Sequence, residues 1–317
     1  MDLNIIWFIL VGILLTGYAI LDGFDLGVGA LHLLTKGDLN RRISINSIGP
    51  VWDGNEVWLV TGGGALFAAF PDVYATVFSG FYIAFMLLLF FLIFRAVAIE
   101  FRSKQENIKW RAWWDRAFSF SSIFIAFLMG VALGNIITGI AIGYDKEYAG
   151  TFLQLLNPYS LLVGITTVSL FMMHGAIYLV MKTDGDLQTQ IRGWVNNTLI
   201  FFTICFVTTT MATLIYYPAM VNHFKEFPPF FLLAIITMLA IANIPREIHH
   251  GKEFRAFLSS SATIAMLLVL FAIGIFPNLV LSNLNPEYSL NIYNAASSQK
   301  TLMIMLIMAI IGMPFVI

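Results

Sequence analysis

Long apolar segments alternate with short polar loops along nearly the whole chain. A helix that crosses the hydrocarbon core of a bilayer needs about 20 mostly apolar residues, and nine segments approach this length. Most prolines lie at or near the ends of these segments, where helices start or stop. The pattern predicts an all-α integral membrane protein with nine transmembrane helices. Their predicted ranges are residues 4–34, 51–70, 74–99, 117–143, 158–181, 194–217, 229–245, 256–282 and 299–317.

A short motif repeats within the chain. Leu10-Val-Gly-Ile13 recurs as Leu162-Val-Gly-Ile165, near the starts of the first and fifth predicted spans. Both spans enter the membrane from the same side, which is typical of duplicated units in parallel orientation. Chance similarity between glycine-rich apolar helices is the alternative. Within one membrane domain of residues 1–317, we predict two pseudo-repeated four-helix bundles and a ninth helix, which cover residues 4–143, 158–282 and 299–317.

Composition supports the membrane class and excludes several others. The chain is 59% hydrophobic and 11% charged, whereas soluble domains carry about 25% charged residues. The net charge of −1 excludes a nucleic-acid binder that acts by neutralising phosphates. Cys205 is the single cysteine, which excludes an internal disulfide, an iron–sulfur ligand set and a CxxCH haem attachment. The first apolar run is too long for a signal peptide, so the first helix is expected to stay.

The basic residues predict the orientation. Of the 17 Lys and Arg residues, most fall in one set of alternate loops, and only Lys146, Lys225 and Lys300 fall in the other. The positive-inside rule therefore predicts an external N-terminus and a cytoplasmic C-terminus. No basic residue follows the ninth segment, so a chain that extends past Ile317 is expected. The first set consists of Lys36, Arg41, Arg42, Arg102, Lys104, Lys109, Arg111, Arg116, Lys182, Arg192, Arg246, Lys252 and Arg255.

Acidic residues interrupt the first two apolar segments. Asp22 and Asp25 lie in the first, and Asp53 and Glu56 lie in the second. Each pair has i,i+3 spacing, so its members share one helix face. A charge inside the membrane is costly unless it is paired, protonated or solvated, so such residues are functional candidates. The predicted orientation places all four near the cytoplasmic leaflet.

Further charges continue this group at the cytoplasmic end of the third span, where Arg95, Glu100 and Lys104 lie. We predict that the four acids, Glu100 and Lys104 form a proton path from the cytoplasm, with Arg95 as a charge partner. Helix capping at the interface is the alternative for the aspartates. Glu56 could merely pair with Arg95, and Lys104 could snorkel to the interface.

Trp52 and the histidines are the residues to consider for cofactor binding. Trp52 is a candidate contact for a quinone ring, with interfacial anchoring as the alternative. His32 and His174 lie in predicted spans without an obvious axial partner, so a b-type haem held by this chain is not expected. His174 is interpreted as a hydrogen-bonded core residue. We predict no metal site and no catalytic residue within this chain.

Several ordered blocks carry a specific resemblance. The chain resembles subunit II of bacterial cytochrome bd quinol oxidase over nearly its whole length. The blocks are Gly23-Phe-Asp-Leu-Gly-Val-Gly29, Arg41-Arg42, Ile45-Asn-Ser-Ile-Gly-Pro50, Trp52-Asp-Gly-Asn-Glu-Val-Trp58, Gly63-Gly-Ala-Leu-Phe-Ala-Ala69, Phe94-Arg95, Glu100-Phe-Arg-Ser-Lys104, Leu155-Leu-Asn-Pro158 and Asn294-Ala-Ala-Ser-Ser298.

The resemblance implies a haem-free subunit in the bacterial inner membrane, beside a homologous subunit I that carries haems b and d and the quinol-oxidising loop. Such a complex oxidises quinol, reduces dioxygen to water and takes protons from the cytoplasm. By resemblance, Asp25, Asp53 and Lys104 lie on the proton path that has been proposed for the family. Glu100 stands where some members carry Asp, and Glu56 where some carry Gln.

The resemblance also implies other partners. Some family members hold a structural quinone near the tryptophan that corresponds to Trp52, and a small accessory subunit and membrane lipid are further expected partners. Two alternatives remain open from the residues alone. One is a proton-coupled transporter, which would move protons without a partner; the other is an assembly subunit whose acids carry no protons.

Overall fold

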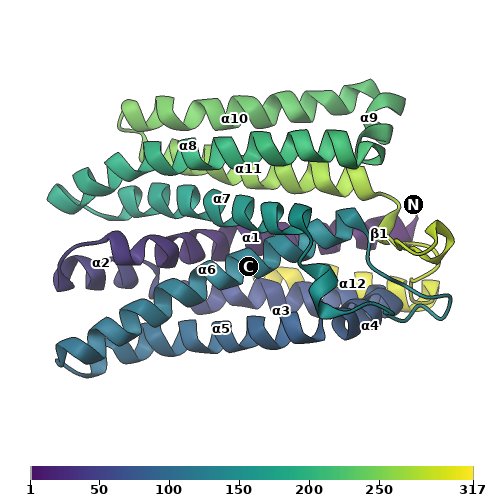
Figure 1. Cartoon of the computed structure of the whole chain (residues 1–317), viewed down its shortest axis with the longest axis horizontal. Coiled ribbons are helices and arrows are strands. Elements are labelled where there is room, and N and C mark those ends of the chain that lie inside the picture. The colour runs from purple at the N-terminus through teal and green to yellow at the C-terminus, as the bar shows by residue number, and fades with distance from the viewer. Residues whose placement is uncertain (1, 317) are drawn as a thin grey trace.

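The computed structural model describes residues 2–316 as a bundle of long helices that lie roughly side by side (Figure 1). A small β-hairpin and the N-terminus lie at one end of the bundle, and α2 lies at the other. The long helices are α1 (Leu3–Leu31), α3 (Trp52–Ala69), α5 (Tyr82–Phe101), α6 (Ile108–Thr138), α7 (Pro158–Lys182), α8 (Gly185–Tyr216), α10 (Phe231–His249), α11 (Glu253–Ile275) and α12 (Gln299–Val316). The short elements are α2 (Asp38–Ile48), α4 (Pro71–Gly80), α9 (Asn222–Glu226), β1 (Asn278–Val280) and β2 (Leu290–Asn291).

Within residues 2–316, seven helices are long and apolar enough to cross a membrane, namely α1, α5, α6, α7, α8, α10 and α11. This confirms the prediction of an all-helical membrane protein. Helix α3 is not among the seven, and the apolar part of α12 that qualifies covers only Gln299–Gly312. The count of nine spans and the division into two four-helix bundles therefore stay predictions.

Several predicted helix boundaries were wrong. The predicted span 74–99 is divided, because α4 ends at Gly80 and α5 begins at Tyr82. A Cβ at residue 80 would lie 2.9 Å from the Tyr148 ring, so only glycine fits there, and glycine weakens a helix. The predicted span 256–282 ends too late, since α11 stops at Ile275 and β1 follows. Pro245, which was expected at a span end, lies inside α10.

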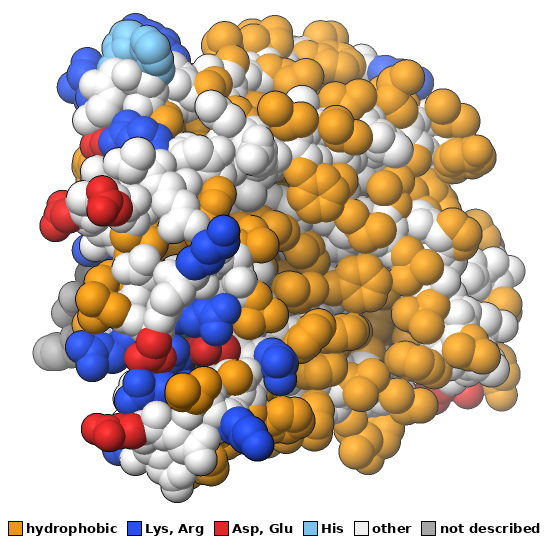
Figure 2. Space-filling view, turned by 60° about the vertical axis from the view of Figure 1, so that its left-hand side comes forward, with side chains coloured by type: hydrophobic (Ala, Val, Ile, Leu, Met, Phe, Trp, Pro, Cys, Tyr) orange, Lys and Arg blue, Asp and Glu red, His pale blue; other side chains and the backbone are white. Residues whose placement is uncertain are grey.

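Basic side chains gather at one end of the bundle, as Figure 2 shows, and hydrophobic side chains cover the flank beside it. This basic end is formed by α2 and by the connections α5–α6, α7–α8 and α10–α11. It includes Arg41, Arg102, Arg111 and Lys182. An apolar flank below a charged rim is the surface expected of a membrane-embedded bundle.

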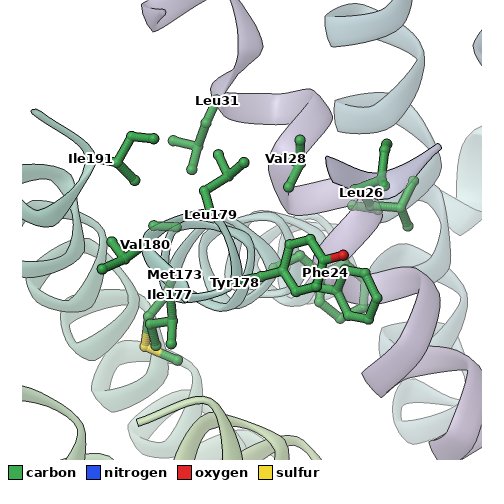
Figure 3. Close-up of a cluster of buried hydrophobic side chains, with 14 of the residues drawn as sticks. Phe24, Leu26, Val28, Leu31, Met173, Ile177, Tyr178, Leu179, Val180 and Ile191 are labelled. Carbon is green, nitrogen blue, oxygen red and sulfur yellow. The ribbon is translucent and has the colours of Figure 1, made fainter. Parts of the chain in front are cut away.

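The core of the bundle forms where α1 crosses α7. Phe24 of α1 stacks on Tyr178 of α7 with ring centroids 4.0 Å apart, within a cluster of buried apolar side chains that Figure 3 shows. Gly27 and Gly175 let the two backbones touch. A Cβ on Gly27 would overlap the carbonyl oxygen of Phe171, and a Cβ on Gly175 would overlap the backbone of Gly27. Small residues permit such close approach of membrane helices.

We expect the substitution Gly27→Ala to destabilise the subunit by about 1–3 kcal/mol, because backbone atoms cannot move aside as side chains can. The measurement is the thermal stability of the purified assembly in detergent. Gly193→Ala is the matched control, since a Cβ at residue 193 meets no atom within 4 Å. Equal melting of the two variants would show that the α1–α7 crossing tolerates a wider separation.

Candidate functional site

A buried ion pair joins α1 to α5. The Arg95 guanidinium donates through Nη1 to Asp22 Oδ2 at 2.8 Å and through Nη2 to Asp22 Oδ1. Both side chains are fully buried. The two parallel bonds match the fork of the guanidinium to the carboxylate, which is the strongest form of such pairing. Each of the two charges therefore lowers the free-energy cost of burying the other at membrane depth.

Glu56 of α3 approaches the same arginine. Its Oε1 lies 3.5 Å from Arg95 Nη1, and its side chain is 24% exposed. Oε1 accepts no hydrogen bond from the described residues. Glu56 thus stands between the buried pair and the surface of α3.

Asp25 has fewer partners than Asp22. Its Oδ2 accepts a hydrogen bond of 2.7 Å from Asn55 Nδ2, and that amide also donates to the Leu21 carbonyl at 3.2 Å. Oδ1 of Asp25 is buried and has no hydrogen-bond partner in the described part of the chain. The Tyr18 hydroxyl, two helical turns away on α1, is likewise buried without a partner. Sequence reasoning missed Asn55; the available signal was a lone amide inside an apolar span.

The charges of this cluster do not balance. One guanidinium, Arg95, is the counter-charge beside Asp22 and Glu56, and the carboxyl group of Asp25 lies one turn from Asp22 on the same face of α1. If all three were ionised, two negative charges would remain uncompensated in or near the membrane, which is costly. The arrangement is therefore suited to holding a proton on a carboxyl group and passing it on.

The other predicted path residues lie outside this cluster. Asp53, Glu100 and Lys104 are exposed. None of them forms a hydrogen bond or an ion pair with any part of the chain that the structure describes. Asp53 is linked to the cluster only through its i,i+3 neighbour Glu56 on α3. Trp52 is partly buried and packs against the main apolar core.

A second charged cluster at the basic end was not predicted. His32 Nε2 lies 2.7 Å from Asp115 Oδ1, and Arg102 Nε donates to the same carboxylate. Arg41 Nη1 donates to Asp115 Oδ2 at 3.1 Å. Asp115 went unnoticed because it lies among the basic residues and tryptophans that begin α6, a composition typical of a membrane interface.

The histidines within the spans have different partners. His174 lies 2.7 Å from the Ser260 hydroxyl and 3.0 Å from the Ile20 carbonyl, and it is fully buried. This confirms its interpretation as a hydrogen-bonded core residue. Across the described residues, no three or more His, Cys, Asp and Glu side chains are grouped so as to hold a metal ion.

Comparison with known proteins decides the family. A family model described as cytochrome bd terminal oxidase subunit II matches residues 3–317. The chain belongs to this family. It is 37% identical to cytochrome bd-I ubiquinol oxidase subunit 2 of Escherichia coli strain K12, over 99% of this chain and 91% of that protein. It is also 37% identical to cytochrome bd ubiquinol oxidase subunit 2 of Bacillus subtilis strain 168, over 100% of this chain and 93% of that protein.

The fold agrees with this assignment. A chain of the bd oxidase from Geobacillus thermodenitrificans superposes with a TM-score of 0.81 at 20% sequence identity, over 100% of this chain and 96% of that one. The chain is thus a subunit of a cytochrome bd terminal quinol oxidase, an oxidoreductase complex of the respiratory chain. Family membership implies a partner subunit I and a multi-pass location in the inner membrane. Membership of an oxidase family replaces the alternative of a proton-coupled transporter. The alternative of an assembly subunit whose acids carry no protons stays open.

Proposed function

We propose that this chain is a haem-free subunit that supplies a proton-uptake path from the cytoplasm to the haem-bearing subunit I and supports assembly of the oxidase. Reduction of dioxygen to water consumes one proton for each electron, so the complex needs such a path. The observation that carries the proposal is the buried cluster of one arginine and three carboxyl groups, in which Asp25 keeps an unpartnered oxygen. Haems b and d belong, in this proposal, to the partner.

Each residue of the cluster has a distinct role. The basic end faces the cytoplasm by the positive-inside rule, and the exposed Asp53, Glu100 and Lys104 gather protons there. Glu56, partly exposed and 3.5 Å from Arg95, relays protons inward. Asp25 is the inner carrier, held in place by Asn55 through one oxygen while the other is free to bind a proton. Asp22 and Arg95 stay paired and fix the position of the cluster.

Helix α3 provides the face that meets subunit I. Only Asn55, Gly62 and Ala69 of its 18 residues are buried within this chain. Its outward surface includes Asp53 and Thr61, which are poorly suited to contact with lipid. A protein partner on this face satisfies these polar groups and receives protons across a short distance. Trp52 at the start of α3 is the proposed contact of a structural quinone, beside membrane lipid and a small accessory subunit as further partners.

The substitution Asp53→Asn tests the proton path. We expect quinol-dependent oxygen uptake to fall by about two- to threefold with haem content unchanged, because an outer carrier is lost while the exposed site stays hydrated. Uptake is measured on the purified complex at equal haem concentration. Asp186→Asn, an exposed acid near the start of α8 at the same end, is the matched control and should turn over normally. Unchanged turnover in Asp53→Asn would favour the assembly-only alternative.

A further inference from the structure

A stripe of polar side chains, interrupted by Gly29, runs along one face of α1 to His32 just past its end. Tyr18, Asp22, Asp25, Gly29 and His32 follow one another at spacings of four and three residues, so they lie along roughly a quarter of the helix circumference. Phe24 of the same helix instead packs on α7 (Figure 3). The stripe extends the proposed proton site toward the basic end, beyond the residues that its function requires.

Unpartnered polar atoms recur along this stripe. The Tyr18 hydroxyl, Asp25 Oδ1 and His32 Nδ1 are all buried and have no hydrogen-bond partner among the described residues. They are spaced by seven residues, which is two helical turns. The hydroxyl oxygen of Thr35, just past His32, is also buried and has no hydrogen-bond partner among the described residues. Buried polar groups are almost always paired, with protein or with ordered water. Several orphaned groups in one line indicate water molecules between α1 and its neighbours.

Helix α6 presents a matching polar face. Asp115, Ser119 and Ser122 are buried and spaced by four and three residues. Ser122 lies against Gly29, because a Cβ on Gly29 would overlap its hydroxyl. That hydroxyl donates to the Phe118 carbonyl at 2.8 Å and keeps its lone pairs for accepting. Asp25 and His32 are about 10 Å apart along the axis, and Ser122, which lies against Gly29, falls between them in register.

The outer end of the stripe reaches solvent. A cleft of about 290 Å³ at the basic end is lined by Asp38, Arg41, Arg111 and Asp115, among others. Asp115 lies at its base and contacts His32 behind it. Arg102 links Asp115 to Asp38, whose side chain is 49% exposed. The Asp115 side chain therefore separates the water in the cleft from the buried imidazole of His32.

We propose that His32 and Asp115 form a second proton-uptake branch, which runs between α1 and α6 and joins the first branch at Asp25. The inference rests on the proposed proton-uptake function of the subunit. A proton that passes from cleft water through Asp115 binds Nε2 of the Nδ1–H tautomer of His32, and the resulting imidazolium releases its other proton from Nδ1 toward Ser122 and Asp25. The ring is then left with its proton on Nε2, and rotation of the ring returns that proton to the inner side before the next transfer. An imidazole suits this relay because its two nitrogens face opposite directions. The Arg41 and Arg102 guanidiniums on Asp115 oppose the imidazolium charge and so favour release inward.

Parallel branches make a distinctive prediction for combined variants. The whole oxidase is prepared with Asp53→Asn, with His32→Gln and with both. Because the branches act in parallel, each single variant should keep turnover within roughly threefold of the parent complex, and the double variant should lose at least about tenfold. A double variant no slower than the product of the two single effects overturns the second branch. If Asp53→Asn alone slows turnover and the double variant equals it, only this branch fails and the proposed function stands.

Ser122→Ala guards against a purely structural effect, since its hydroxyl bonds only to its own helix. Combined with Asp53→Asn, Ser122→Ala should slow turnover at least about threefold further. It should also increase the ratio of the turnover rates in H2O and D2O, because proton transfer limits turnover more strongly when the water file is broken. Should His32→Gln fail to assemble, this pair carries the test. Turnover and isotope effect equal to those of Asp53→Asn alone would show that α1 and α6 conduct no protons.

Discussion

The substitution Asp25→Asn should lower the quinol oxidase turnover of the assembled complex by about 100-fold or more. Asp25 is where both proposed branches meet, so no parallel route compensates for its loss. Asparagine has the same shape as aspartate, can still accept the Asn55 hydrogen bond of 2.7 Å and cannot carry a proton. The loss should therefore appear in turnover and not in the amount of complex.

The measurement is quinol-dependent oxygen uptake at matched haem content, alongside the reduced-minus-oxidised visible spectrum. Asp25→Glu restores a titratable group at nearly the same place and should regain part of the rate. Absence of the complex from Asp25→Asn membranes would make Asp25 a structural residue. Near-normal turnover in assembled Asp25→Asn would remove it from the path altogether.

The substitution Arg95→Gln should prevent stable assembly of the subunit. Removing one partner of a buried ion pair typically costs about 3–5 kcal/mol, because the other charge is left uncompensated. Here Asp22 would lose its only counter-charge at full burial, and Glu56 would lose its neighbour at 3.5 Å. We expect little or no subunit in purified membranes, measured by immunoblot and by haem content of the complex.

A second substitution distinguishes charge from shape. If the uncompensated Asp22 carboxylate is the cause, Asp22→Asn combined with Arg95→Gln should restore much of the assembled complex, because two amides can bond to each other. Asp22→Asn alone should reduce assembly less than Arg95→Gln, since Arg95 would still have the Glu56 carboxylate as a counter-charge at 3.5 Å. A double variant that is as unstable as Arg95→Gln would show that the volume of the guanidinium, rather than its charge, holds α1 against α5.

The sequence predicted the acids of the site and named Arg95 as their charge partner, but it did not show that Arg95 pairs with Asp22 or that Asn55 binds Asp25. Spacing along one helix shows that Asp22 and Asp25 share a face, whereas their partners Arg95 and Asn55 lie 73 and 30 residues away. Such distances along the chain carry no periodic signal, so only tertiary packing reveals them. Pairing with Arg95 was the alternative to a proton-path role for Glu56, and the two groups do lie 3.5 Å apart.

Other features could not be foreseen for local reasons. At the break between α4 and α5, Gly80 lies against the Tyr148 ring, which comes from a distant loop. His32 and Asp115 form a pair across 83 residues, and each looked unremarkable within its own segment. Asp53, Glu100 and Lys104 were predicted together with the buried acids, but their side chains are exposed and form no contact that would join them to the buried cluster among the described residues.

The polarity of α3 has a consequence for biosynthesis. A carboxylate at the centre of a spanning segment raises the free energy of insertion by about 2.5–3.5 kcal/mol, and α3 begins with two acids and an amide. We expect the newly made α3 to leave the insertion channel together with α1, since Asn55 bonds to Asp25 and Leu21 there. Its outer face then stays poorly matched to lipid until subunit I arrives. A subunit made in excess would expose this helix to membrane proteases, so degradation would match its amount to that of its partner.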